Sequence, residues 1–153
     1  MAKHDKALAP TRRSALADVK AGPEGGPLLA PISVGELFDK ITILEIKAER
    51  ITDSAKQLNV LSELHLLRDV RDREVVRSAA FDRLSAELKG VNDSLWRIED
   101  DLRNCERQGE FGARFVQLAR SVYRINDRRA QLKRQINELS GSLILEEKFY
   151  NNY

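Results

Sequence analysis

The chain has 153 residues, of which 42% are hydrophobic and 33% are charged, so it can form one small domain with a buried core. Its 26 lysines and arginines nearly balance its 24 acidic residues, and the formal net charge is only +2. A charge this small excludes a strongly basic nucleic-acid-binding protein.

Two further features narrow the class of protein. No apolar run is long enough to span a membrane, and the first residues lack the apolar core of a signal peptide, so we expect a cytoplasmic protein without a membrane segment. Cys105 is the single cysteine, which leaves no internal disulfide and suits a reducing compartment. His4 and His65 lie far apart with no cysteine near them, so we expect neither a metal site nor a cofactor.

Residues 1–31 differ in composition from the rest of the chain. They hold all four prolines and three of the eight glycines, without a sustained amphipathic period, so we expect a disordered tail. Five basic and three acidic residues in this segment account for the whole net charge. Residues 32–153 are therefore neutral overall, and we expect them to form a single helical domain.

The first helix is expected over about residues 33–52. Ser33 and Glu36 have the spacing of a capping box, and Ile32 and Leu37 occupy the two positions of a hydrophobic staple. The apolar stripe consists of Val34, Leu37, Ile41, Leu44, Ala48 and Ile51, and it is widened by Phe38, Ile43 and Ile46. A stripe this wide predicts contact with more than one neighbouring helix.

The second helix is expected over about residues 54–75. Ser54 and Gln57 form another possible capping box at its start. Its apolar residues are Leu58, Val60, Leu61, Leu64 and Leu67. The helical period is then lost in a charge-dense run, so we expect a bend or loop between Val70 and Ala80.

The longest apolar pattern runs from Phe81 to Leu139 and is interrupted once. On both sides of the interruption, apolar residues alternate spacings of three and four, as in a coiled coil. The interruption at residues 108–112 contains two glycines around a short polar turn. If the chain folds back there, the numbers of facing residues sum to a constant 220, as for Cys105 and Phe115. We therefore predict an antiparallel, coiled-coil-like helical hairpin.

With the two earlier helices, this hairpin gives an all-α fold, an up-down four-helix bundle with short connections. The hairpin helices are expected at about 79–107 and 113–140, followed by a C-terminal tail. Residues 81–106 carry a net charge of about −3 and residues 113–139 one of about +5, so the two helices attract each other.

The two flanks of the hairpin differ in composition. The aromatic and small-residue flank holds Asn92, Trp96, Glu99, Val116, Ala119, Tyr123, Asn126 and Ala130. The polar flank holds Arg83, Gly90, Arg97, Asn104, Gln117, Arg124 and Gln131. We expect the first helix to dock on the former flank and leave the polar flank in water.

Four stretches of the chain resemble a known family. They are residues 33–47 (SVGELFDKITILEIK), 91–103 (VNDSLWRIEDDLR), 119–130 (ARSVYRINDRRA) and 146–150 (EEKFY). These stretches resemble a bacterial family of short proteins that is classed as a domain of unknown function, and the resemblance covers roughly residues 33–153. It implies a small bacterial helical protein with no established activity, so no catalytic residue is carried over from it.

Polar residues gather near the middle of the hairpin. The candidates for a binding site are Asn92, Glu99, Asn126 and Arg129, flanked by Trp96 and Tyr123, with Lys40 or Lys47 in reach from the first helix. One interpretation is a buried polar network that fixes the helix register, in which Glu99 or Glu87 neutralises Arg129. On this interpretation Arg129→Leu should keep or raise the melting temperature. The alternative is a pocket for a small anion or a sugar phosphate, with Arg129 as the charged fork and Trp96 or Tyr123 as a stacking wall.

Two other segments have alternative interpretations. Arg120, Arg124 and Arg128 recur at every fourth residue, either as a solvated ridge or as a basic surface for phosphate. The apolar and aromatic ending from Leu143 to Tyr153 either packs across the open end of the bundle or binds a partner.

No order of residues typical of a nucleophilic or phosphate-binding enzyme is present. We therefore expect a non-enzymatic interaction or adaptor protein that binds a protein partner or itself. The alternative is a protein that binds a small anionic ligand.

Overall fold

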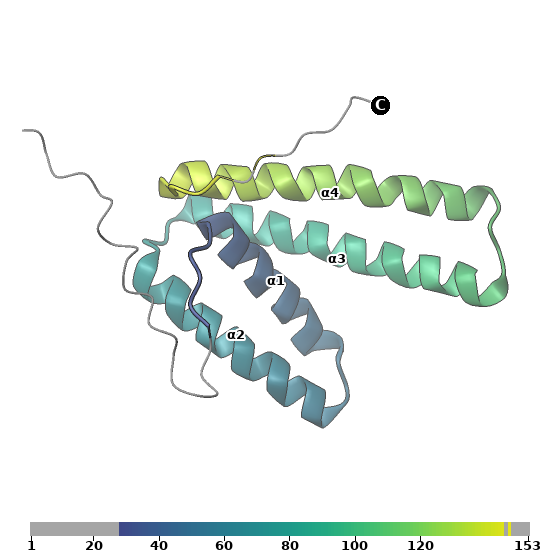
Figure 1. Cartoon of the computed structure of the whole chain (residues 1–153), viewed down its shortest axis with the longest axis horizontal. Coiled ribbons are helices and arrows are strands. Elements are labelled where there is room, and N and C mark those ends of the chain that lie inside the picture. The colour runs from purple at the N-terminus through teal and green to yellow at the C-terminus, as the bar shows by residue number, and fades with distance from the viewer. Residues whose placement is uncertain (1–27, 146, 148–153) are drawn as a thin grey trace, which may run out of the picture. The chain divides into compact units, whose positions relative to one another are not determined.

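Figure 1 shows the chain as a computed structural model, which describes residues 28–145 and residue 147. Helix α1 spans Val34–Arg50, α2 spans Ser54–Glu74, α3 spans Ala79–Gln108 and α4 spans Ala113–Ser140. The described residues contain no strand. The predicted all-α class and the up-down order of four helices are confirmed.

The chain divides into two units, Met1–Pro31 and Ile32–Tyr153, and all four helices belong to the second. The predicted disorder of residues 1–31 concerns a segment that lies mostly outside the described residues. Within the described part of the chain, no helix has the length and apolar character required to cross a membrane.

Local signals determine where the helices begin and end. The Ser33 hydroxyl caps α1 by accepting a hydrogen bond from the Glu36 amide at 3.1 Å, as the capping box predicts. Gly109 ends α3 and Gly141 ends α4, with φ angles of 67° and 65°. Glycine adopts this left-handed conformation without a steric penalty, so the predicted break after α3 is confirmed.

The connection between α2 and α3 lies within the predicted range although it contains neither proline nor glycine. Helix α2 ends at Glu74, and the Ser78 hydroxyl caps α3 by accepting a hydrogen bond from the Phe81 amide at 3.4 Å. Val75 between them is buried in the same cluster as Phe81. Burial of Val75 therefore holds the turn in place.

Helix α1 lies at the centre of the packing. It contacts α2, α3 and α4, whereas α2 contacts α1 alone among the described helices (Figure 1). Leu37, Ile41 and Leu44 of α1 pack with Leu64 of α2. Phe38 packs on the other side in a cluster with residues of the α3–α4 hairpin. The wide apolar stripe of α1 thus faces two neighbours, as predicted.

The predicted register of the α3–α4 hairpin is confirmed at its core. Leu88 and Leu132, whose numbers sum to 220, are both fully buried in one cluster. The prediction is wrong at the last layer, because Leu139 is 45% exposed instead of covering Phe81. Phe38 of α1 stacks on Phe81 instead, with 5.7 Å between the ring centroids.

Helix α1 docks on the predicted flank of the hairpin, but it covers only part of it. Its side chains contact Asn92 and Trp96 on that flank, and its backbone contacts Asn137 of α4. Val116 and Tyr123 lie farther towards the α3–α4 turn and remain exposed. The outer part of this flank is therefore uncovered by any described helix, contrary to the expectation for the whole flank.

The segment after α4 was expected either to pack on the bundle or to bind a partner. Leu143, Ile144 and Leu145 are all exposed, so these three residues do not form part of the core. Phe149, Tyr150 and Tyr153 lie outside the described residues.

Candidate functional site

A polar network lies where α1 crosses α3 and α4. Arg129 of α4 donates hydrogen bonds from Nε and Nη2 to the two carboxylate oxygens of Asp39 on α1, at 2.8 and 2.5 Å. Asn92 of α3 donates from Nδ2 to the same carboxylate at 2.9 Å and to the Thr42 hydroxyl at 3.0 Å. Asp39 and Thr42 are each only 1% exposed. Buried charge-assisted hydrogen bonds of this kind position α1 against the hairpin.

Two further contacts hold the first turn of α1 against α4. The Gly35 amide donates a hydrogen bond to Asn137 Oδ1 at 2.6 Å, and Lys133 Nζ lies 2.6 Å from a Glu36 carboxylate oxygen. A Cβ atom at position 35 would collide with the Lys133 backbone carbonyl. Glycine at this position therefore permits the close approach of the two helices.

A cavity of about 210 Å³ opens beside the polar network. It is lined by Ile43, Ile46, Lys47, Asn92, Leu95, Trp96, Glu99 and Arg129, which come from α1, α3 and α4. The Arg50 guanidinium lies 5.4 Å from the centroid of the Trp96 ring and forms an ion pair with Asp93. Arg50 itself does not line the cavity. The end of α1 therefore holds the indole from outside the cavity.

The structure brings together five of the eight candidate residues predicted from the sequence. These are Lys47, Asn92, Trp96, Glu99 and Arg129, which all line the cavity. Asn126 lies next to the cavity, where its Oδ1 accepts a hydrogen bond from Arg129 Nη1 at 3.4 Å.

The other two candidates lie elsewhere. Lys40 forms an ion pair with Glu63 of α2 at 2.7 Å. Tyr123 is 37% exposed on α4, and neither side chain lines the cavity.

The predicted partners of Arg129 were wrong. Glu99 lies 3.6 Å from Arg103, and Glu87 forms an ion pair with Arg128. Arg129 instead binds Asp39, because the docking of α1 brings a carboxylate closer to the guanidinium than either acid of α3.

Sequence reasoning missed Asp39 and Thr42 as members of the site. Together with Gly35 and Ile46 they recur at spacings of four, three and four, so they share one face of α1. All four residues are buried. The sequence signal that could have identified Asp39 is its position on a helix face of small and apolar residues. A carboxylate on such a face is expected to be buried, and a buried carboxylate requires a hydrogen-bonding partner.

Tyr123 lies among arginines on the surface of α4. Hydrogen bonding from Arg120, together with the nearby charge of Arg124, lowers the pKa of the Tyr123 phenol. The Arg124 guanidinium lies 6.0 Å from the centroid of the Tyr123 ring. Two arginines of the predicted ridge, Arg120 and Arg124, therefore interact with the Tyr123 side chain.

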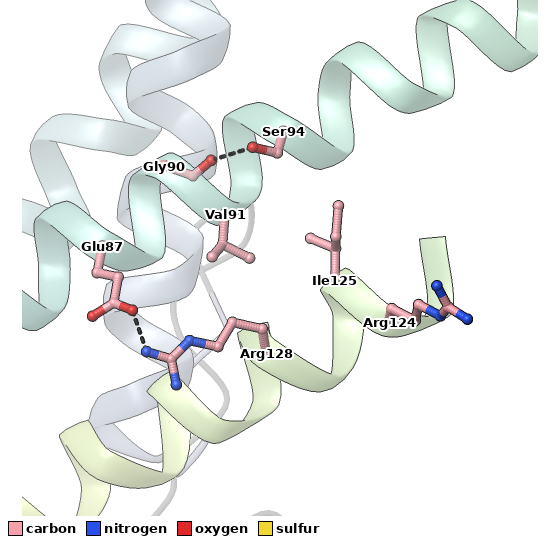
Figure 2. A pocket seen from close by; sticks show the side chains of 7 residues that line it. All are labelled: Glu87, Gly90, Val91, Ser94, Arg124, Ile125 and Arg128. Atoms are coloured by element: carbon pink, nitrogen blue, oxygen red, sulfur yellow. Dashed lines mark hydrogen bonds and ion pairs between the residues drawn. The ribbon is translucent and has the colours of Figure 1, made fainter. Parts of the chain in front are cut away.

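A second hollow lies on the polar flank of the hairpin, between α3 and α4 (Figure 2). It has a volume of about 430 Å³ and is lined by Glu87, Gly90, Val91, Ser94, Arg124, Ile125 and Arg128. Figure 2 shows Val91 and Ile125 pointing into the space between the two helices. We call this hollow the α3–α4 groove.

Neither hollow contains an obvious reactive constellation. Among the described residues, no group of three or more histidine, cysteine, aspartate or glutamate side chains could hold a metal ion. Cys105 is free and fully buried, so its thiol is shielded from solvent. The arrangement of charged, amide and aromatic groups suits binding.

The cavity and the α3–α4 groove belong to an all-helical fold in which one flank of a long hairpin receives a shorter hairpin, while no described helix covers the other flank. The chain belongs to a family of unknown function, DUF6165, which matches residues 29–153. This match confirms the predicted resemblance to a family of unknown function. No curated protein and no solved structure matches the chain.

Proposed function

We propose that this chain is a protein-interaction module that binds an acidic, amphipathic helix of a partner protein in the α3–α4 groove. The observation that carries the proposal is a hollow of about 430 Å³ on a flank that no described helix covers. Hollows between helices commonly receive a further helix with its apolar face inwards.

The shape of the groove favours the close approach of a helix. Val91 and Ile125 supply apolar surface between α3 and α4. At Gly90, an added Cβ atom would meet no other atom within 4 Å. The absence of a side chain there leaves room for the backbone of a partner helix.

The charges along the groove favour an acidic partner. Arg128 forms an ion pair with Glu87, so its charge is largely compensated. Arg124 has no carboxylate partner among the described residues and extends along α4 (Figure 2). A second copy paired symmetrically through the groove would bring a second Arg124 into the same interface, and this added positive charge disfavours self-association there.

The test uses substitutions that block the groove without weakening the fold. Gly90→Leu should fill the groove and also raise helix stability by about 0.5–1 kcal/mol, because glycine is a poor helix former. Gly90→Ala is the matched control, since it improves helix propensity but adds only one methyl group. Arg124→Glu reverses the uncompensated charge, and Arg73→Glu on the exposed surface of α2 controls for the change of net charge.

Proteins retained from an extract of the native host by the immobilised chain would be compared across these variants. We expect one partner to be lost with Gly90→Leu and Arg124→Glu but kept with Gly90→Ala and Arg73→Glu. Equal retention by all four variants would refute binding in the groove. If the chain dimerises in a concentration-dependent way and Gly90→Leu abolishes the dimer, the groove binds a second copy of the chain and not a partner protein.

The earlier alternative, a pocket for a small anion, receives less support. Asp39 binds Arg129 through both carboxylate oxygens and so compensates the positive charge that would attract an anion.

We further propose that the protein acts in the cytoplasm and has a non-enzymatic role. The single free cysteine, which suits a reducing compartment, supports that location.

A further inference from the structure

We propose that the cavity between α1, α3 and α4 binds a small neutral polyol of the size of one monosaccharide ring. The cavity lies on the flank that α1 covers, so it is separate from the α3–α4 groove and the inference goes beyond the interaction function. Five polar or aromatic side chains from the three helices line it, with apolar residues between them.

The charges in the cavity favour a neutral ligand. Arg129 and Asp39 compensate each other through two hydrogen bonds. The other charged lining residues are Lys47 and Glu99, which have opposite signs. An anion would face the Glu99 carboxylate and a cation would face the Lys47 ammonium, and each like-charge contact is unfavourable. A neutral molecule avoids both penalties.

The hydrogen-bonding groups favour hydroxyls over other neutral groups. Lys47 is a donor that makes no hydrogen bond or ion pair with the described residues. Asn92 uses its amide nitrogen for Asp39 and Thr42, and its Oδ1 accepts no hydrogen bond from the described residues. Glu99 adds a second acceptor. Hydroxyl groups donate and accept at the same atom, so a polyol can satisfy all three side chains.

The walls and the volume favour a compact ring. Trp96, Leu95, Ile43 and Ile46 form apolar surface, against which the C–H face of a sugar ring can pack. The volume of about 210 Å³ lies below the roughly 300 to 1,000 Å³ of pockets for drug-sized ligands. A single ring is therefore the appropriate size, and an oligosaccharide is not.

The cavity contains its own spectroscopic reporter, because Trp96 is the single tryptophan of the chain. The full chain would be titrated with glycerol, D-glucose, D-mannose and D-ribose, and separately with inorganic phosphate, while tryptophan emission is recorded. We expect a saturable change with at least one of the four polyols and none with phosphate.

Variants then test whether the response comes from the cavity. Lys47→Met and Glu99→Leu should each weaken the apparent affinity by about tenfold, as expected for the loss of a hydrogen bond to a charged group. Lys40→Met is the matched control on α1, because Lys40 pairs with Glu63 and does not line the cavity. Its titration should match that of the parent.

Three outcomes would overturn the proposal. These are no saturable change with any polyol, a change with phosphate alone, or equal responses of Lys47→Met, Glu99→Leu and the parent. The Glu99 side chain is 53% exposed, so Glu99→Leu should fold. This variant keeps the test decisive if the Lys47→Met protein fails to fold. Circular dichroism would establish folding of each variant.

Discussion

Arg129 binds both carboxylate oxygens of Asp39, although 90 positions separate the two residues in the chain. The pair joins the last helix to the first across the hairpin. It also changes what a substitution at Arg129 should do. The heptad pattern alone treats Arg129 as a charged residue in an apolar seam, whose replacement by leucine should be tolerated.

We predict instead that Arg129→Leu destabilises the protein by about 3–5 kcal/mol, because it leaves the buried Asp39 carboxylate without its cation. Asp39→Asn should cost less, since the Arg129 side chain is 29% exposed and can still reach water. Urea unfolding of both variants measures the two costs. A double substitution, Asp39→Leu with Arg129→Leu, should cost less than the sum of the single changes, and additive costs would refute the coupling.

Gly35 and Gly90 should respond in opposite directions to the same substitution. Gly35→Ala should destabilise by about 1–3 kcal/mol, because the added Cβ collides with the Lys133 carbonyl and forces α1 away from α4. Gly90→Ala should stabilise by about 0.5–1 kcal/mol, because open space surrounds that position and alanine favours a helix. Thermal unfolding would measure both, and a stabilised Gly35→Ala protein would contradict the close approach.

The hairpin register places Leu95 and Ile125 opposite each other, because their numbers sum to 220, but the structure predicts different costs for an aspartate at each. Leu95 is only 6% exposed, so Leu95→Asp buries a charge and should unfold the protein at a cost of several kcal/mol. Ile125 is partly buried and lines the α3–α4 groove, where water can reach the new carboxylate. Circular dichroism should show a helical Ile125→Asp protein, and equal unfolding of both variants would argue against an open groove.

Tyr123 should titrate below the ordinary range of a tyrosine. Its phenolate is favoured by the hydrogen bond from Arg120 and by the Arg124 charge, which together lower its pKa. NMR of the ring carbons across alkaline pH would measure this, with Tyr123→Phe to assign the signal among the three tyrosines. Arg120→Gln should raise the Tyr123 pKa towards its usual value, whereas Arg73→Gln should not change it.

Much of the fold follows from short-range sequence patterns. Ser33, Gly109 and Gly141 mark helix ends through backbone hydrogen bonds and dihedral angles that depend on a few neighbouring residues. The heptad period places Leu88 opposite Leu132 because the turn at residues 108–112 sets the register of both helices. These features need no knowledge of how α1 approaches the hairpin.

The candidate site depends partly on that approach. Five of its predicted residues could be found because the flank on which α1 docks is visible in the composition of α3 and α4. The partner of Arg129 could not, since several acidic residues lie within plausible reach in sequence and only the docked position of α1 selects Asp39.

The sequence by itself thus determined the helices, their ends and the hairpin register, because these depend on local hydrogen bonding and on the helical period. The tertiary structure decided which carboxylate is buried with Arg129, why Leu139 is exposed, and which flank of the hairpin stays open. Those outcomes depend on how far α1 extends along the hairpin and at what distance it packs. Long-range packing sets both, through contacts such as Gly35 against the Lys133 carbonyl.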